Sequence, residues 1–173
     1  GCREAIIQAQ HDIVLIAQVT VETTGTMLMG SEIGAALNAL EPMGIDLIGL
    51  NCATGPAEMS EHLRYLSKNA KVSLSVMPNA GLPILGAKGA EYPLGPEELA
   101  QALETFVGDY GISLIGGCCG TTPEHLAAVV NKLGAKAIPE RASDLDPGAS
   151  SLYQYVPFRQ ENTYMAIGER TNA

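Results

Sequence analysis

The chain has 173 residues, which is enough for one ordinary domain with a hydrophobic core. Hydrophobic residues make up 46% of it, but there is no Trp and there are only two Phe, so the composition favours an aliphatic α/β core. A formal charge of −9 argues against nucleic acid and anionic membranes as partners, because neither attracts an acidic surface. No apolar run reaches the roughly 18 residues of a membrane span. Four cysteines in a composition typical of a cytoplasmic enzyme favour metal-binding or catalytic thiols over disulfides.

The N-terminus has neither an initiator Met nor the layout of a signal peptide. Residues 5–9 have the pattern of the end of a helix. We therefore expect the chain to be a piece of a longer protein.

The first strand is predicted over residues 13–22, where an apolar run changes to an alternating pattern that ends at Glu22. Ser31 then has the position of a helix N-cap. The helix that it opens is predicted to end at Pro42 and Gly44.

Three further strand–helix units follow. Their strands are predicted over residues 46–51, 72–77 and 112–116. Each helix begins at a proline, a residue suited to the first helical turn: Pro56, Pro96 and Pro123. The core-facing stripes are predicted at Met59, Leu63, Leu66 and Ala70; at Leu99, Leu103, Phe106 and Tyr110; and at Leu126, Val129, Val130 and Leu133. A long Gly- and Pro-rich loop is predicted over residues 78–95.

This alternation predicts an α/β fold with a parallel sheet covered by helices. A doubly wound sheet is one possibility. The other is a (β/α)₈ barrel, which needs about 250 residues, so the part of this chain up to residue 138 would be half of one. The barrel is favoured because polar residues follow all four strands at their carboxyl ends, the face of a barrel where chemistry occurs: Glu22, Asn51, Cys52, Asn79, Cys118 and Cys119.

The character of the sequence changes after residue 138. Residues 139–162 are polar and irregular and are predicted to be an interdomain linker. Residues 163–173 have the pattern of a new strand, the first of another domain.

Three cysteines are the strongest candidates for chemistry. Cys52 follows the second strand, and Cys118 and Cys119 follow the fourth, within a run of glycines that permits a sharp turn. Three thiolates without an obvious fourth ligand predict a zinc site with one open position, the mark of a catalytic rather than a structural zinc. The alternative is that all three are small buried hydrophobic residues. Cys2 lies outside any motif and is predicted to be a bystander.

Two other polar residues lie at strand ends. Asn79 could offer its amide oxygen as a weak fourth zinc ligand that leaves when substrate arrives, or it could be an ordinary turn residue. Glu22 could hold the ammonium group of a substrate, or it could be a solvated loop acid. The three histidines have no ligand spacing to each other and are predicted to be surface residues: His11, His62 and His125.

Three motifs together carry a resemblance to a known family: GLNCATGP at residues 49–56, MPNAGLP at 77–83 and GGCCGTTPEH at 116–125. They closely resemble homocysteine S-methyltransferase domains. The final GERTN, residues 168–172, is similar to the first strand of a pterin-binding domain. That order of domains is the one found in cobalamin-dependent methionine synthases, and the resemblance covers essentially the whole chain.

The resemblance implies the second half of a (β/α)₈ barrel that uses zinc and methylcobalamin to methylate homocysteine, with methyltetrahydrofolate as the ultimate methyl donor. It implies that Cys52, Cys118 and Cys119 bind the zinc, that Glu22 holds the substrate amino group and that Asn79 is an exchangeable ligand. The folate and cobalamin domains of the parent chain would be partners. Because four strand–helix units and those domains are missing here, we expect this chain to be inactive alone.

Two alternatives remain at this point. One is a homocysteine methyltransferase that uses a betaine or sulfonium donor without cobalamin. The other is a non-catalytic zinc or thiol-redox module.

Overall fold

The computed structural model describes residues 1–87, 89–134 and 136–165. Its centre is a four-stranded parallel sheet whose strands lie in chain order: β1 (Ile16–Val19), β2 (Leu47–Asn51), β3 (Ser73–Met77) and β6 (Leu114–Ile115). A doubly wound sheet would reverse this order at a switch point. Each crossover here leads instead to the adjacent strand, as in consecutive strands of a (β/α)₈ barrel. The predicted parallel α/β fold is confirmed, and the strand order is that of a barrel segment.

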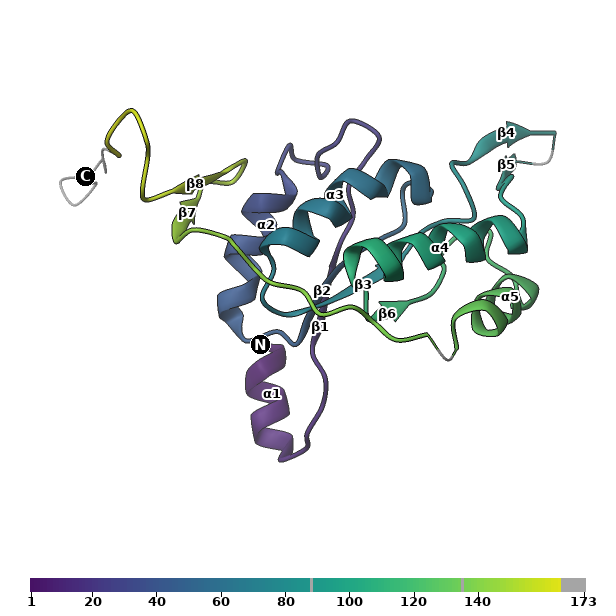
Figure 1. Cartoon of the computed structure of the whole chain (residues 1–173), viewed down its shortest axis with the longest axis horizontal. Helices are drawn as coiled ribbons and strands as arrows, with labels where there is room; N and C mark the ends of the chain where they lie inside the picture. Colours follow the sequence, from purple (N-terminus) through teal and green to yellow (C-terminus); the bar gives the residue numbers. More distant parts are fainter. Residues whose placement is uncertain (88, 135, 166–173) are drawn as a thin grey trace.

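One helix, α1 (Cys2–Ala9), precedes the first strand. A helix then follows each of the four strands: α2 (Ile33–Leu40), α3 (Pro56–Asn69), α4 (Pro96–Tyr110) and α5 (Pro123–Leu133), with a short 3₁₀ helix, η1 (Glu41–Met43), after α2. Figure 1 shows α2, α3 and α4 in a row on one side of the sheet, with α1 standing apart below it. Among the described residues, no helix combines the length and the apolar character that crossing a membrane requires.

The starts of α3 and α4 follow the sequence signals closely. In both helices a Glu in the first turn reaches back to the backbone N–H of the N-cap glycine: Gly55 N–H donates to Glu58 at 3.1 Å, and Gly95 N–H donates to Glu98 at 2.8 Å. The prediction for α2 is wrong by one residue, because Glu32 is its N-cap and makes no side-chain capping bond. Ser31 is buried before the helix begins.

The core lies between the sheet and this row of helices. On the helix-facing side of the sheet, Ile48, Leu50, Leu74 and Val76 are at most 1% exposed. They pack against the predicted stripes of α3 and α4, which are buried as expected: Met59, Leu63, Leu66, Ala70, Leu99, Leu103 and Phe106. Tyr110 is half-buried and stacks on Phe106.

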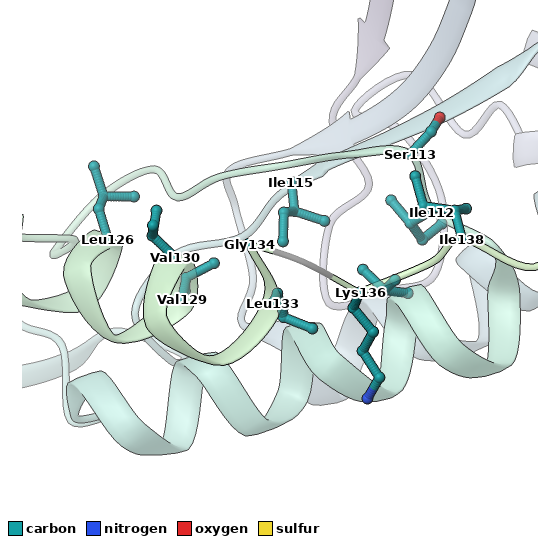
Figure 2. A pocket seen from close by; sticks show the side chains of 11 residues that line it. Ile112, Ser113, Ile115, Leu126, Val129, Val130, Leu133, Gly134, Lys136 and Ile138 are labelled. Atoms are coloured by element: carbon teal, nitrogen blue, oxygen red, sulfur yellow. The ribbon is translucent and has the colours of Figure 1, made fainter.

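The stripe predicted for α5 is only half correct. Val129 and Leu133 are buried, but Leu126 is 45% exposed and Val130 is 65% exposed. Both line an apolar groove of about 450 Å³ between α5 and β6 (Figure 2). Within the described residues, β3 is the only strand that pairs with β6, so this side of α5 has no further layer to pack against.

Other elements also differ from the sequence patterns. The first strand is much shorter than residues 13–22, because only Ile16–Val19 pairs with β2. The loop predicted over residues 78–95 contains a small hairpin of β4 (Ile84–Gly86) and β5 (Gly89–Glu91).

The predicted linker is also more ordered than its composition suggested. It contains a second hairpin, β7 (Gly148–Ser150) and β8 (Tyr155–Pro157). This hairpin lies against α2, where Glu32 N–H donates to the carbonyl of Tyr153 at 2.8 Å. In the strand predicted for residues 163–173, residues 163–165 form no strand, and residues 166–173 lie outside the described part of the chain.

Arg141 attaches the start of this segment to the domain. Its guanidinium donates to the carbonyls of Ser67 and Ala70 at 3.2 and 3.1 Å, at the carboxyl end of α3, and to that of Val72 at 2.5 Å. The last carbonyls of a helix have no partner within the helix, so a cation there satisfies them and matches the helix dipole.

We predict that Arg141→Ala lowers the free energy of unfolding by about 2 kcal/mol, because it removes hydrogen bonds from a charged donor to three half-buried carbonyls. Urea denaturation followed by circular dichroism measures this. The matched control is Arg64→Ala, since Arg64 forms an exposed pair with Glu61 on α3 and its loss should cost less than about 0.5 kcal/mol. Equal effects of the two substitutions would contradict the prediction.

Candidate metal centre

Cys52 directly follows β2, and its backbone is strained. Its φ is 59° and that of Ala53 is also 59°, a left-handed conformation that costs a non-glycine residue about 1–2 kcal/mol. The conformation is held by hydrogen bonds: Cys52 N–H donates to the carbonyl of Met77 at 3.1 Å, and Thr54 N–H donates to that of Cys52 at 2.7 Å. Such strain tends to cluster at functional sites.

Cys118 and Cys119 follow β6 in a loop that turns sharply, as the glycines predicted. Thr121 N–H donates to the carbonyl of Cys118 at 3.2 Å, and Gly120 within that turn has a φ of 78°. The loop also pairs with the end of β3, because Cys118 N–H donates to the carbonyl of Pro78 at 2.8 Å. The turn brings both neighbouring thiols to the same side.

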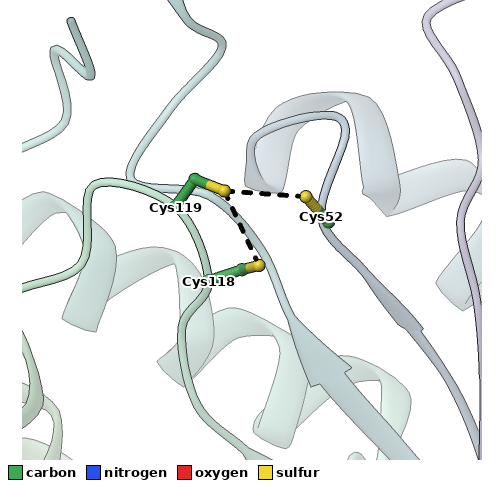
Figure 3. Close-up of side chains that lie close together, drawn as sticks. All are labelled: Cys52, Cys118 and Cys119. Atoms are coloured by element: carbon green, nitrogen blue, oxygen red, sulfur yellow. Dashed lines mark hydrogen bonds between the residues drawn. The ribbon is translucent and has the colours of Figure 1, made fainter.

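The three sulfur atoms converge (Figure 3). Cys52 Sγ lies 3.7 Å from Cys119 Sγ, which lies 3.9 Å from Cys118 Sγ, and all three atoms are within 4.8 Å of one another. These separations are far too long for disulfides. A tetrahedral zinc with Zn–S bonds of about 2.3 Å needs sulfur atoms about 3.8 Å apart. Two of the three separations match this value and the third is within 4.8 Å, so the cluster is compatible with three corners of a tetrahedral metal site.

The thiols also influence one another's ionisation. Burial, together with hydrogen bonds to Cys52 and Cys119, raises the pKa of Cys118 to about 11. The pKa of Cys119 is lowered, because Cys52, the Tyr92 hydroxyl and Cys118 donate hydrogen bonds to its thiolate. Without a cation the cluster thus favours negative charge on one sulfur, and it can hold three thiolates only around a positive ion.

Asn79 is 2% exposed and joins the two cysteine loops. Its Oδ1 accepts a hydrogen bond from Cys119 N–H at 3.1 Å, and its own N–H donates to the carbonyl of Thr54 at 3.1 Å. Its role as an exchangeable metal ligand stays a prediction. Its side-chain oxygen is adjacent to the cluster and is bound here to the backbone of Cys119.

Glu22 lies beyond the end of β1 and is exposed. Its N–H donates to the carbonyl of Thr26 at 2.9 Å, and the structure does not bring its carboxylate into the cysteine cluster. It belongs to the same edge of the sheet, because Thr20 and Asn51, at the ends of β1 and β2, are joined by a side-chain hydrogen bond of 3.3 Å. Its substrate-binding role stays a prediction.

Two residues near the cluster were not predicted from the sequence. Tyr92, from the segment after β5, packs on the cysteine turn so closely that a Cβ at Gly120 would lie 2.4 Å from it. His125 is only 7% exposed, so its assignment to the surface is wrong. The sequence around Tyr92 has no local signal for this contact. For His125 a signal was available: it lies in the first turn of the helix that follows the cysteines, where a side chain can cap the backbone of the helix start. Cys2 is exposed and does not belong to the cluster.

The family of this chain follows from comparison with known proteins. A family model described as homocysteine S-methyltransferase matches residues 2–133, which include all three clustered cysteines. The chain belongs to the homocysteine S-methyltransferase family. The resemblance carried by the three motifs is thereby confirmed.

Two curated relatives place the chain within longer members of the homocysteine S-methyltransferase family. A methionine synthase of Mycobacterium tuberculosis is 61% identical over 173 residues, which is 100% of this chain and 14% of that protein. A methionine synthase of Mycobacterium leprae is 61% identical over 178 residues, which is 100% of this chain and 15% of that protein. The chain therefore spans about one seventh of the length of the relatives that it matches.

We predict that zinc binding to this chain weakens as pH falls. Since the pKa of Cys118 is about 11, its proton must be displaced at any pH between 6 and 8, so the logarithm of the apparent association constant should rise by at least about one per pH unit. Competition with a chromophoric chelator measures the affinity, and calorimetry in two buffers counts the released protons. Cys2→Ser should leave both unchanged. A pH-independent affinity would show that the thiols are not the ligands.

We predict that Gly120→Ala disturbs the centre. A Cβ at a φ of 78° costs about 1–2 kcal/mol, and it would also displace the ring of Tyr92. The variant should lose both stability and zinc affinity, measured by thermal unfolding with and without the metal. Gly108→Ala is the control, because a Cβ at this position on α4 meets open space and should be neutral or stabilising. Similar behaviour of the two variants would contradict the strain argument.

Proposed function

We propose that this chain is the part of a cobalamin-dependent methionine synthase that activates homocysteine for methylation. The observation that carries the proposal is the convergence of Cys52, Cys118 and Cys119 to sulfur separations that fit a tetrahedral zinc site. Membership of the homocysteine S-methyltransferase family supports it. We also propose that the parent protein is cytoplasmic.

The three cysteine sulfurs would hold zinc and leave the fourth tetrahedral position to the substrate. When bound, zinc would lower the pKa of the homocysteine thiol and keep it as a thiolate at neutral pH. The chain's own contribution is negative charge, since three thiolate ligands keep electron density on the substrate sulfur. The backbone around Cys52 and Cys119 would fix where that sulfur lies.

The reaction that follows is a transfer of a methyl group to sulfur. The substrate sulfur forms a bond to the methyl carbon, and the bond from that carbon to its donor breaks with its electron pair remaining on the donor. As the motif resemblance implies, the donor would be methylcobalamin, which methyltetrahydrofolate would remethylate. The product is methionine.

The methyl donor would be bound by domains outside this chain. In the relatives, about six sevenths of the protein lies beyond the matched part, which leaves room for folate and cobalamin domains. We propose that residues 1–138 form half of the homocysteine barrel, that residues 139–162 connect it to the next domain and that residues 163–173 begin a pterin-binding domain.

Two further residues have proposed roles. Glu22, on the same sheet edge as the cysteines, would hold the substrate ammonium group. Asn79 would be the exchangeable fourth ligand, whose Oδ1 moves from the backbone of Cys119 to the metal when substrate is absent.

The proposal is tested by X-ray absorption at the zinc edge, on the full-length parent protein with and without homocysteine. We predict that homocysteine exchanges one oxygen or nitrogen ligand for sulfur. In the same protein, Cys52→Ser should lower methionine formation more than about 100-fold. This is a larger loss than is usual when a residue that contacts a metal ligand, rather than the ligand itself, is substituted. Cys2→Ser is the matched control and should retain activity, because Cys2 is exposed and outside the cluster. An unchanged zinc shell would instead support a non-catalytic zinc module.

A further inference from the structure

We propose that His125 is a positioning residue for the cysteine centre, which locks the segment 92–94 onto the cysteine loop and so holds Cys118 and Cys119 in place. The inference rests on the proposed metal-binding function. The argument begins with the position of His125 in its helix.

His125 occupies the position that a glutamate has in the two preceding helices. In α3 and α4, Glu58 and Glu98 cap the backbone N–H of the N-cap residue. In α5 the N-cap is Thr122, and its N–H donates to Nδ1 of His125 at 3.2 Å. A glutamate would be sufficient for this local cap. A histidine adds a second nitrogen on the far side of the ring.

That second nitrogen makes a contact far from the helix in sequence. Because a backbone N–H can only donate, Nδ1 of His125 accepts from Thr122, and the proton of the neutral ring must be on Nε2. Nε2 lies 2.9 Å from the carbonyl oxygen of Leu94 and therefore donates to it. The ring is 7% exposed, so both bonds are shielded from water.

Leu94 in turn is linked to a metal-binding cysteine by two backbone hydrogen bonds. Leu94 N–H donates to the carbonyl of Ala80 at 2.9 Å, and Ala80 N–H donates to the carbonyl of Cys119 at 2.9 Å. From Cys119 the chain returns through the turn to Thr122 and His125. The result is a closed ring of covalent and hydrogen bonds that contains the cysteine loop, and His125 is the side chain that closes it.

The locked segment also covers the cysteine turn. The side chain of Tyr92 is packed against Gly120, and Leu94 and Pro93 lie against Gly81, where an added Cβ would be 3.2 Å from each. If His125 released Leu94, this segment would be held only by the hydrogen bond from Leu94 N–H to Ala80 and by its remaining packing. The positions of Cys118 and Cys119 would then be less well determined, which raises the ordering cost of metal binding.

Two uncharged substitutions separate the hydrogen bond at Nδ1 of His125 from the hydrogen bond at Nε2. In His125→Asn, the amide oxygen lies near the position of Nδ1, so the cap on Thr122 is retained and the bond to Leu94 is lost. In His125→Gln, the amide nitrogen reaches the position of Nε2 and can donate to Leu94. His11→Asn is the control, because His11 is exposed before β1.

The probe is Co²⁺ bound to the 173-residue chain in place of zinc, with its thiolate charge-transfer and d–d absorption as the signature. We expect His125→Asn to weaken Co²⁺ binding about tenfold or more and to change the spectrum, within the range known for residues behind metal ligands. We expect His125→Gln to restore most of the affinity and spectrum, and His11→Asn to match the wild type. In the metal-free chain, amide hydrogen exchange at Ala80 and Leu94 should be faster in His125→Asn only.

The outcomes distinguish this inference from the proposed function. If the wild-type chain binds Co²⁺ through thiolates and His125→Asn matches it in affinity, spectrum and exchange, the positioning role is wrong while the metal site stands. Equal losses in His125→Asn and His125→Gln would reduce His125 to general packing and also overturn the inference. If the wild-type chain shows no thiolate charge-transfer band with Co²⁺, the proposed function fails first, and the positioning role fails with it.

Discussion

Three thiols lie within 4.8 Å of one another, and as thiolates they would repel one another unless a cation lay between them. Without a cation, the backbone has to hold the three cysteines together. A single four-residue segment at the end of β3 holds them all. Within residues 77–80, the carbonyls of Met77 and Pro78 accept hydrogen bonds from the N–H groups of Cys52 and Cys118. Asn79 Oδ1 accepts from Cys119 N–H, and Ala80 N–H donates to the carbonyl of Cys119. Cys52 and Cys119 are 67 residues apart in sequence, yet both are held by this segment.

The position of that segment is a consequence of the sheet. β3 lies between β2 and β6, and parallel strands place their carboxyl ends on one edge. The loops that follow β2 and β6 therefore lie on either side of the loop that follows β3. The sheet is fixed in turn by fully buried residues such as Leu74 and Val76, which pack against the helix row. The metal geometry thus depends on aliphatic packing well below it.

The predictions from sequence succeeded where a local pattern has a local cause. Proline at the first helical position gave the starts of α3 and α4, because its missing N–H has no partner within a helix end and its φ is already helical. The three cysteines were found because Cys52 and the glycine-flanked pair Cys118 and Cys119 directly follow predicted parallel strands, whose carboxyl ends meet at one edge of the sheet. Where the cause was not local, the predictions failed. Leu126 and Val130 continue an apolar stripe, yet their exposure depends on what packs beside β6. His125 carries a helix-start signal, but its burial depends on Leu94, 31 residues earlier in the chain.

The sequence by itself determined the parallel α/β class, the identity of the three clustered cysteines and the family, since each depends on residue type and spacing along the chain. Only the tertiary structure decided that Cys119 Sγ lies 3.7 Å from Cys52 Sγ and 3.9 Å from Cys118 Sγ. It also decided that Asn79 is buried and bonded to Cys119, that His125 is buried and bonded to the carbonyl of Leu94, and that Tyr92 covers the turn. The physical reason is that these features depend on hydrogen bonds and contacts between segments brought together by strand pairing. A local sequence pattern specifies which groups can bond within a turn or a helix end. It does not specify which distant carbonyl a buried imidazole will meet.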